Sequence, residues 1–144
     1  EQLKEELQEK VKETEGKYSS VDDKVKEMEE GIKPLANFKS MSSTELEPLL
    51  QKLEEQAASL KEAITGFKSE IAEMKEGVDP EVTPWFTQQC RPVDSKAFGL
   101  DPRLNRMTGL ITRSKAELKV KANQELQALE KTMLAMLRYH QTTK

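Results

Sequence analysis

Few side chains in this sequence could perform covalent or metal chemistry, and they lie far apart. Cys90 is the only cysteine and His140 the only histidine. A single cysteine forms neither an internal disulfide nor the paired thiolates of a zinc or redox motif. Arg91 would lower the pKa of the neighbouring Cys90 thiol modestly, yet no imidazole accompanies it as a base. These spacings predict no catalytic residue and no metal site.

Most of the other side chains that could take part in chemistry are charged: Asp, Glu, Lys and Arg make up 34% of the 144 residues. Their carboxylates follow the faces of helical segments, a pattern that is typical of solvated surface. The glycines in "TGF" and "TGL" are isolated, so the sequence contains no phosphate-binding glycine loop. We therefore expect a protein that is not an enzyme and that uses no cofactor.

Basic residues concentrate in the last part of the chain. Residues 79–144 hold 11 basic and 7 acidic groups, whereas residues 1–35 hold 7 basic and 11 acidic groups. The densest basic patch consists of Arg103, Arg106, Arg113, Lys115, Lys119 and Lys121. These cations lie around a helix rather than along one stripe, and no aromatic residues interleave for base stacking. The pattern favours pairing with acidic helices or an acidic partner over binding of nucleic acid or an anionic membrane.

Residues 79–101 differ from the rest of the chain because they combine prolines with aromatic side chains. The prolines are Pro80, Pro84 and Pro92, and they predict a joint that is not one continuous helix. We expect a short helix or turn at 83–89 and then an extended crossing. The proposed anchors of this joint are Trp85, Phe86 and Phe98. They either pack over the end of a helical bundle or dock a partner, and both interpretations stay open.

A helix is predicted over residues 102–144, directly after this joint. Asp101 is a typical N-cap residue, and Pro102 suits the first helical position. The first half of the helix is basic and the second half is apolar. Leu134 and Leu137 widen the apolar stripe of the second half, so we expect that end to touch two neighbours or more.

The strongest pattern lies in residues 45–78, where apolar residues alternate at spacings of three and four. This predicted assembly seam includes Leu46, Leu50, Leu53, Leu60, Ile64, Phe67, Ile71 and Met74. A weaker seam predicts another helix over residues 1–35, and residues 36–44 form the joint between the two helices. Ser42 with Glu45, or Thr44 with Glu47, fits the spacing of a capping box at a helix start.

The predicted fold class is all-α, with three long helices that carry heptad, coiled-coil seams. Hydrophobic residues make up 35% and aromatic residues 5% of the chain, which is too little for a sheet-based globule. A regular apolar stripe must nevertheless be covered. Either the chain folds back on itself as an antiparallel helical bundle, or its segments pair with other chains as a segmented coiled coil. Complementary charge favours the first arrangement and the regular heptads favour the second.

These features predict a non-enzymatic structural and interaction module. We expect a coiled-coil subunit segment of a multi-protein scaffold or tethering complex, whose partners are other coiled-coil chains in a homo- or hetero-oligomer. An alternative comes from the basic helix at 103–121. Long three-helix hairpins with basic faces are similar to membrane-binding domains of the BAR type, which implies binding to an anionic membrane surface, or to nucleic acid.

The sequence also gives an expectation for location. The chain starts at Glu1 within a helical pattern, so we expect a segment of a longer protein. It contains no signal peptide, and no apolar run approaches the roughly 20 residues of a membrane-spanning helix. With one cysteine and no glycosylation motif, an intracellular protein, cytoplasmic or nuclear, is predicted.

Overall fold

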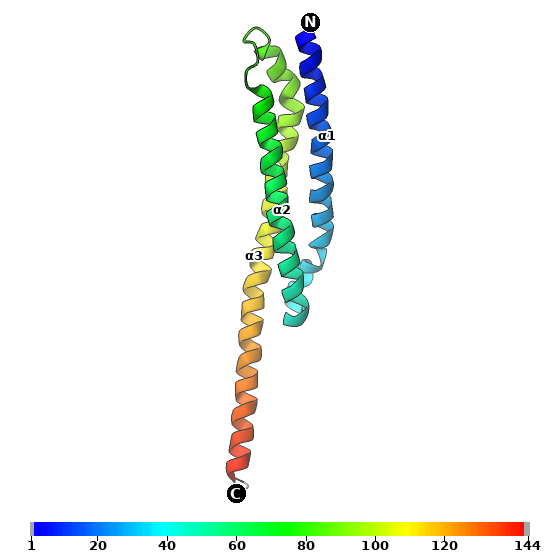
Figure 1. Ribbon diagram of the computed structural model, residues 1–144. Helices are drawn as coiled ribbons and strands as arrows, with labels where there is room; N and C mark the ends of the chain where they lie inside the picture. Colours follow the sequence, from blue (N-terminus) through cyan, green and yellow to red (C-terminus); the bar gives the residue numbers. More distant parts are fainter. Residues whose placement is uncertain (1, 143–144) are drawn as a thin grey trace.

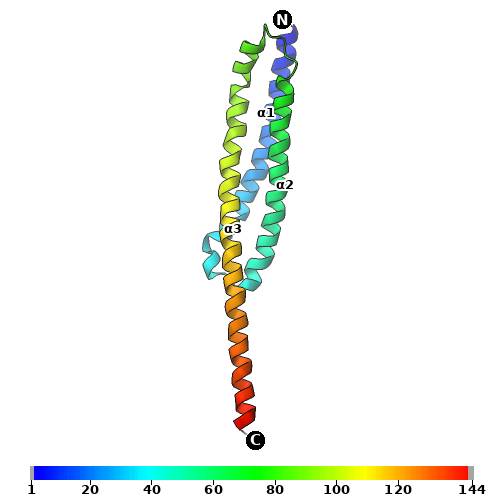
Figure 2. The same cartoon turned by 90° about the vertical axis from the view of Figure 1, so that its left-hand side faces the viewer.

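The computed structural model describes residues 2–142, which form three α-helices and one 3₁₀ helix. In chain order these are α1 (Gln2–Gly31), η1 (Lys33–Ser40), α2 (Ser43–Lys75) and α3 (Thr83–Thr142). Successive α-helices run in opposite directions and pack side by side (Figure 1, Figure 2). The described residues contain no strand. The predicted all-α class is therefore confirmed, and of the two arrangements that the sequence left open the structure has the antiparallel helical bundle.

α1 and α2 bury the residues that their spacing of three and four selects. In α1 the buried apolar residues are Leu7, Val11, Val21, Val25 and Met28. Thr14 shares this face, and its hydroxyl donates a hydrogen bond to the Lys10 carbonyl oxygen at 2.8 Å. That bond satisfies the one polar side chain that α1 places in the interior. The apolar stripe, rather than helix propensity alone, thus fixes which face of each helix turns inward.

The joint between α1 and α2 contains the short helix η1. Leu35 is fully buried and holds η1 against the bundle. α2 then begins with Ser42 as its N-cap, because the Ser42 hydroxyl accepts a hydrogen bond from the Glu45 backbone N–H at 3.2 Å. This cap satisfies one of the unpaired N–H groups of the first turn. Of the two predicted capping pairs the structure has Ser42 with Glu45, and α2 begins two residues before the predicted start at residue 45.

A short turn over residues 76–82 joins α2 to α3. Gly77 adopts a φ of 70°, a left-handed conformation that glycine reaches without steric cost. The Asp79 carboxylate accepts a hydrogen bond from the Glu81 N–H at 2.9 Å, and the Thr83 hydroxyl donates to the Asp79 carbonyl oxygen at 2.9 Å. These bonds lead the chain directly into the first turn of α3.

α3 begins at Thr83, where the sequence predicts a short helix or turn, but it continues as a helix through residues 90–101, where an extended crossing was predicted; that part of the prediction is wrong. The helix continues through Pro92 and Pro102 without a break in its assignment. Asp101 is not an N-cap; its carboxylate forms an ion pair with Lys68 on α2. The long third helix therefore covers α2 over most of the length of α2 (Figure 2).

Burial explains why α3 tolerates two internal prolines. Its buried apolar positions follow one another at alternating spacings of four and three, through both prolines: Phe86, Cys90, Val93, Ala97, Leu100, Leu104, Met107 and Ile111. Pro92 and Pro102 lie on the exposed face of the helix. The residues four positions earlier, Gln88 and Phe98, are exposed too, so water can bond the carbonyl groups that lack an N–H donor. Continuous burial outweighs a cost of about 3 kcal/mol for each proline.

Pro92→Ala and Pro102→Ala are each expected to stabilise the bundle. Alanine restores the missing backbone hydrogen bond, and we expect a gain of about 2 kcal/mol after the greater freedom of the unfolded chain is subtracted. The change is measured as a shift of the urea midpoint. Pro84→Ala is the matched control, because Pro84 lies in the first turn, where its missing N–H costs nothing. A destabilised Pro102→Ala variant would contradict this explanation.

Candidate interaction surface on the third helix

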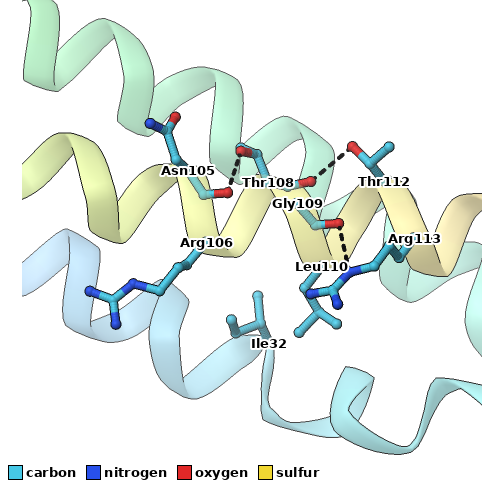
Figure 3. A pocket seen from close by; sticks show the side chains of 8 residues that line it. All are labelled: Ile32, Asn105, Arg106, Thr108, Gly109, Leu110, Thr112 and Arg113. Carbon is cyan, nitrogen blue, oxygen red and sulfur yellow. Dashed lines mark hydrogen bonds between the residues drawn. The ribbon is translucent and has the colours of Figure 1, made fainter.

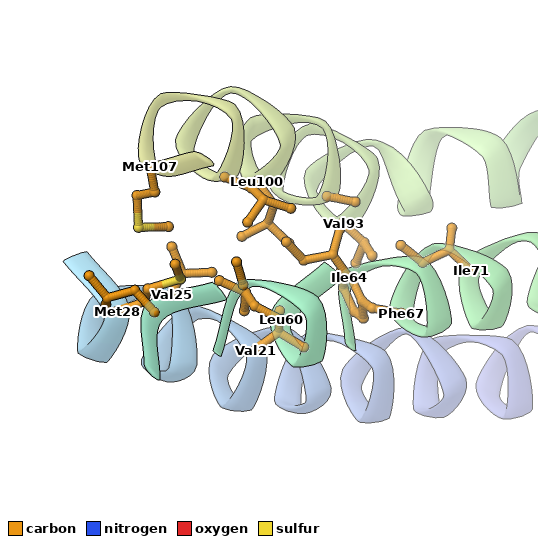
Figure 4. Packing of buried hydrophobic residues seen from close by; sticks show 14 of the residues in the cluster. Val21, Val25, Met28, Leu60, Ile64, Phe67, Ile71, Val93, Leu100 and Met107 are labelled. Atoms are coloured by element: carbon orange, nitrogen blue, oxygen red, sulfur yellow. The ribbon is translucent and has the colours of Figure 1, made fainter. Parts of the chain in front are cut away.

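The eight residues of the predicted assembly seam all lie inside the bundle of a single chain. Their exposed fractions range from 0% at Leu46 to 8% at Met74. Figure 4 shows Leu60, Ile64 and Phe67 of this set between the side chains of α1 and α3. In the folded chain these residues have no surface left for a partner. The seam therefore holds the three helices together, and association between chains would use a different surface.

The aromatic residues of the predicted joint do not form one cluster. Trp85 and Phe86 lie together in the first turn of α3, with ring centroids 6.4 Å apart. Phe86 is buried, and the Lys4 ammonium group lies 5.3 Å from the centroid of the half-buried Trp85 ring. Phe98, by contrast, is 78% exposed. Trp85 and Phe86 thus close one end of the bundle, while Phe98 takes no part in that contact.

Half of the predicted basic patch is engaged within the chain. Arg103 donates to the Asp22 carboxylate at 2.6 Å and to both carboxylate oxygens of Glu29 at 2.6 and 3.2 Å. Lys115 pairs with Glu54 of α2 at 2.8 Å. Lys121 donates to backbone carbonyl oxygens of the first joint. Of the two predicted kinds of partner, acidic helices of the same chain or an acidic partner protein, Arg103 and Lys115 have the first, whereas Lys121 binds backbone carbonyl groups.

The Arg103 contacts also shift the pKa values of the groups involved. The hydrogen bond from Arg103 lowers the pKa of Asp22 below its ordinary value of 3.8, against a smaller opposing effect of burial. It likewise lowers the pKa of Glu29 below 4.5. The two carboxylates in turn raise the pKa of Arg103. The Arg103 side chain is only 22% exposed, so water screens these interactions less than it screens a surface ion pair.

The other three basic residues of the patch lie on the exposed side of α3. Arg106 and Arg113 donate only to carbonyl oxygens of their own helix, at 3.4 Å in each case. Lys119 is exposed and forms no ion pair with the described residues. No carboxylate therefore neutralises these three side chains by direct contact. They are the members of the basic patch that are bound neither to a carboxylate nor to another helix or joint among the described residues.

Two polar contacts hold α3 at the point where it leaves the bundle. The Lys121 ammonium group donates to the carbonyl oxygens of Phe38 at 3.1 Å, Lys39 at 2.8 Å and Met41. The Ser43 hydroxyl donates to the Glu125 carboxylate, with both oxygens 2.8 Å away. Lys121 thus satisfies carbonyl groups at the end of η1, and the pair of contacts fixes the direction of the departing helix.

Apart from the contact between Glu125 and Ser43, α3 has no neighbour within the described chain after Lys121. All residues from Ala122 to Gln141 are exposed, and the helix extends well past the ends of the other two (Figure 1). We call this part the α3 extension. Its large apolar side chains are Leu126, Leu129, Met133, Leu134, Met136 and Leu137, which are 54–59% exposed. An unpacked helix of this length is only marginally stable in water. The extension therefore presents an apolar face that nothing in the described chain covers.

The apolar face of the extension does not continue the seam that faces the bundle. The buried residues of α3 alternate at spacings of four and three. If this alternation is continued beyond Leu118, it falls on residues that are mostly polar or small: Lys121, Glu125, Ala128, Thr132 and Ala135. The large apolar residues follow Ala122 instead, at 126, 129, 133 and 136. This shift of one residue turns the apolar stripe by about 100° around the helix axis. The bundle seam and the extension stripe therefore face different directions.

The two residues that are most capable of chemistry are not near one another. Cys90 is fully buried in the core, and burial raises the pKa of its thiol, so the modest lowering expected from Arg91 is wrong. His140 lies near the far end of the extension, beside the Tyr139 ring. Within residues 2–142 no group of three or more histidine, cysteine or carboxylate side chains has an arrangement that could hold a metal ion.

The departure of the extension from the bundle was not predicted, although the sequence contains a signal for it. The step from Leu118 to Ala122 to Leu126 has spacings of four and four, which break the alternation at the point where packing ends.

Among the described helices none has an apolar stretch long enough to cross a lipid bilayer. Comparisons with models of protein families, with curated proteins and with solved structures gave no match to this chain.

Proposed function

We propose that this chain is a non-enzymatic helical interaction module that joins other coiled-coil chains through the α3 extension. The observation that carries the proposal is the apolar stripe of the extension, which is centred on Leu129 and Met133. Helices with a regular stripe of this kind bury it against a partner helix. Leu134 and Leu137 widen the stripe, which favours contact with more than one partner helix. The module would act inside the cell as part of a scaffold or tethering complex.

The shape of the bundle supports this role. The core residues of α1, α2 and α3 stabilise the folded unit without help from another chain, and the contacts of Lys121 and Glu125 fix the direction of the extension. The bundle would therefore act as a rigid support, and the extension as the part that is recognised. Because the two stripes of α3 face different directions, a partner can cover the extension without competing with α1 and α2.

The alternative role, binding of an anionic membrane or nucleic acid through residues 103–121, has weaker support. Arg103, Lys115 and Lys121 are engaged by groups of the same chain. Only three cations of the patch stay free, which is fewer than the clusters that typically bind acidic membranes. We therefore favour a function in which the α3 extension pairs with a helix of another chain.

The first experiment is sedimentation equilibrium of the chain over a wide range of concentrations. We expect a mass that rises from 16.4 kDa to a defined oligomer. Leu129→Glu combined with Met133→Glu should return the chain to a monomer, because two charges would then have to be buried in the interface. Gln124→Glu with Ala135→Glu is the matched control, since it adds two negative charges to exposed positions on the opposite face of the same helix.

A partner of different sequence is tested by photo-crosslinking in the cells that express the protein. A photoreactive phenylalanine analogue replaces either Met133 on the stripe or Lys131 on the polar face. We expect a discrete protein adduct from position 133 and none from position 131. A chain that stays monomeric and gives no position-specific adduct would rule out the proposed function.

A further inference from the structure

We propose that a second surface, in the bundled part of the molecule, docks an acidic amphipathic helix of a partner protein. This surface is the groove between the end of α1 and α3, and Figure 3 shows the residues that line it. It is separate from the α3 extension, so it neither requires nor replaces the proposed pairing of the extension. The argument rests on Arg106, Arg113 and the apolar floor between them.

The floor of the groove is apolar and open. Ile32, which follows α1 directly, and Leu110 from α3 both line it, and both are only partly buried (Figure 3). Gly109 leaves the α3 backbone uncovered, because a Cβ atom added there would meet nothing within 4 Å. The hydroxyl groups of Thr108 and Thr112 already donate to carbonyl oxygens of α3. A partner could therefore bring an aliphatic side chain close to the backbone of α3.

Two arginines frame this floor at a spacing that suits a helix. Arg106 and Arg113 are two helical turns apart, or about 10.5 Å along the axis, and Gly109 lies between them on the same face. None of the residues that line the groove is acidic. The positive charge of Arg106 helps to lower the pKa of Glu29, so this carboxylate lies in its vicinity. Both carboxylate oxygens of Glu29 are already bound by Arg103. The two guanidinium groups are therefore available to an acidic ligand.

This geometry defines the chemistry of the occupant. A helix that lies along α3 would present two carboxylates seven residues apart, one to Arg106 and one to Arg113. An aliphatic residue three or four positions after the first carboxylate would then reach the floor near Gly109. Arginine binds carboxylates in a two-pronged geometry that suits this arrangement. An acidic helix is favoured over nucleic acid because the site combines only two free cations with an apolar floor.

The test uses three labelled peptides of about 18 residues with an alanine and glutamine background. The first carries one leucine flanked by glutamates three residues before and four residues after it. The second replaces both glutamates with lysine, and the third replaces the leucine with alanine. We expect the first peptide to bind at least tenfold more tightly than either of the others in fluorescence anisotropy. Its binding should weaken with salt, and backbone amide NMR shifts should map to residues 105–113.

Variants of the protein locate the binding. Arg106→Gln with Arg113→Gln should weaken binding of the first peptide about tenfold, since both ion pairs are lost. Gly109→Trp should block the groove, whereas Gly99→Trp should not, because Gly99 is equally open but lies outside the groove. Thermal unfolding of each variant checks that the bundle stays folded.

Several results would overturn the inference. These are no binding at millimolar peptide, equal binding of the lysine peptide, unchanged binding in the Gly109→Trp variant, or NMR shifts confined to the α3 extension. Tighter binding of a short DNA duplex through Arg106 and Arg113 would replace the acidic helix with nucleic acid. Loss of oligomers in the Leu129→Glu and Met133→Glu variant bears only on the extension, so the two proposals can fail independently.

Discussion

Replacing Leu60 and Ile64 together with alanine should unfold most of the bundle. Both side chains are almost fully buried between the helices, at 3% and 2% exposure (Figure 4). Each truncation of this kind typically costs about 2–5 kcal/mol, because it removes buried apolar groups and leaves a cavity. The sum approaches the total stability of an ordinary domain, about 5–15 kcal/mol. We expect loss of the cooperative unfolding transition that circular dichroism follows in urea.

The matched control makes the same kind of change on the α3 extension. Leu129→Ala with Met133→Ala removes side chains that are 57% and 56% exposed, so no cavity forms in the bundle. Unfolding of the bundle should then be nearly unchanged at concentrations where the chain is monomeric. Near-normal stability of the Leu60 and Ile64 double variant would mean that these residues do not form the core.

Among substitutions outside the hydrophobic core, Arg103→Glu should lower the stability of the bundle most. The native guanidinium group lies between Asp22 and Glu29, and a glutamate there would place three carboxylates together. Loss of the ion pairs and the new repulsion should lower the free energy of unfolding by about 2–4 kcal/mol at pH 7. Arg138→Glu is the control, since it makes the same substitution on the exposed face of the α3 extension.

The same ion pairs make a definite prediction for the pH dependence of stability. The folded-state pKa values of Asp22 and Glu29 are lowered, so their contribution is present above the ordinary values of 3.8 and 4.5. It is lost as the pH falls through the lower folded-state values. Acid should therefore destabilise the native chain more than the Arg103→Glu variant, whose carboxylates lose their repulsion when protonated. Parallel stability curves between pH 7 and pH 3 would contradict the assigned role of Arg103.

The sequence predicts α1 and α2 well because local pattern and tertiary packing agree there. Residues at spacings of three and four are the residues that the structure buries, and Ser42 caps α2 as its spacing with Glu45 indicates. Whether the seam would be covered by the same chain or by others could not be read from these spacings. The choice depends on α3, whose buried face supplies the third side of the core.

The extended crossing predicted between residues 89 and 102 is wrong, because the local effect of proline is weaker there than the periodicity of the buried residues. Proline disfavours a helix interior, so Pro92 and Pro102 indicated an interrupted chain. The buried positions Cys90, Val93 and Ala97 nevertheless continue the alternation at spacings of three and four. They include one cysteine and one alanine, which form a weaker apolar signal than the leucines of α2. Burial of a complete face decides the structure, and the prolines occupy the opposite face.

The candidate surfaces were harder to predict than the helices. The six basic residues looked alike in the sequence, but their partners separate them, because Arg103 pairs with α1 while Arg106 and Arg113 face outward. Similarly, the sequence predicts one apolar helix up to its end, and the break in spacing at Ala122 is a weak signal on its own. The position of the neighbouring helices shows that this part of α3 lies outside the bundle (Figure 1).

The parallel course of α1 and α3 has a mechanical consequence. α1 starts at the end of the bundle opposite to the tip of the α3 extension (Figure 1). Tension between these two points pulls the helices in opposite directions along the bundle axis, so α1 would have to slide past its neighbours. This shear loads all contacts of α1 at once, including the two ion pairs of Arg103, whereas sideways peeling would break them one after another. The bundle should therefore resist stretching along its axis far better than force applied across it.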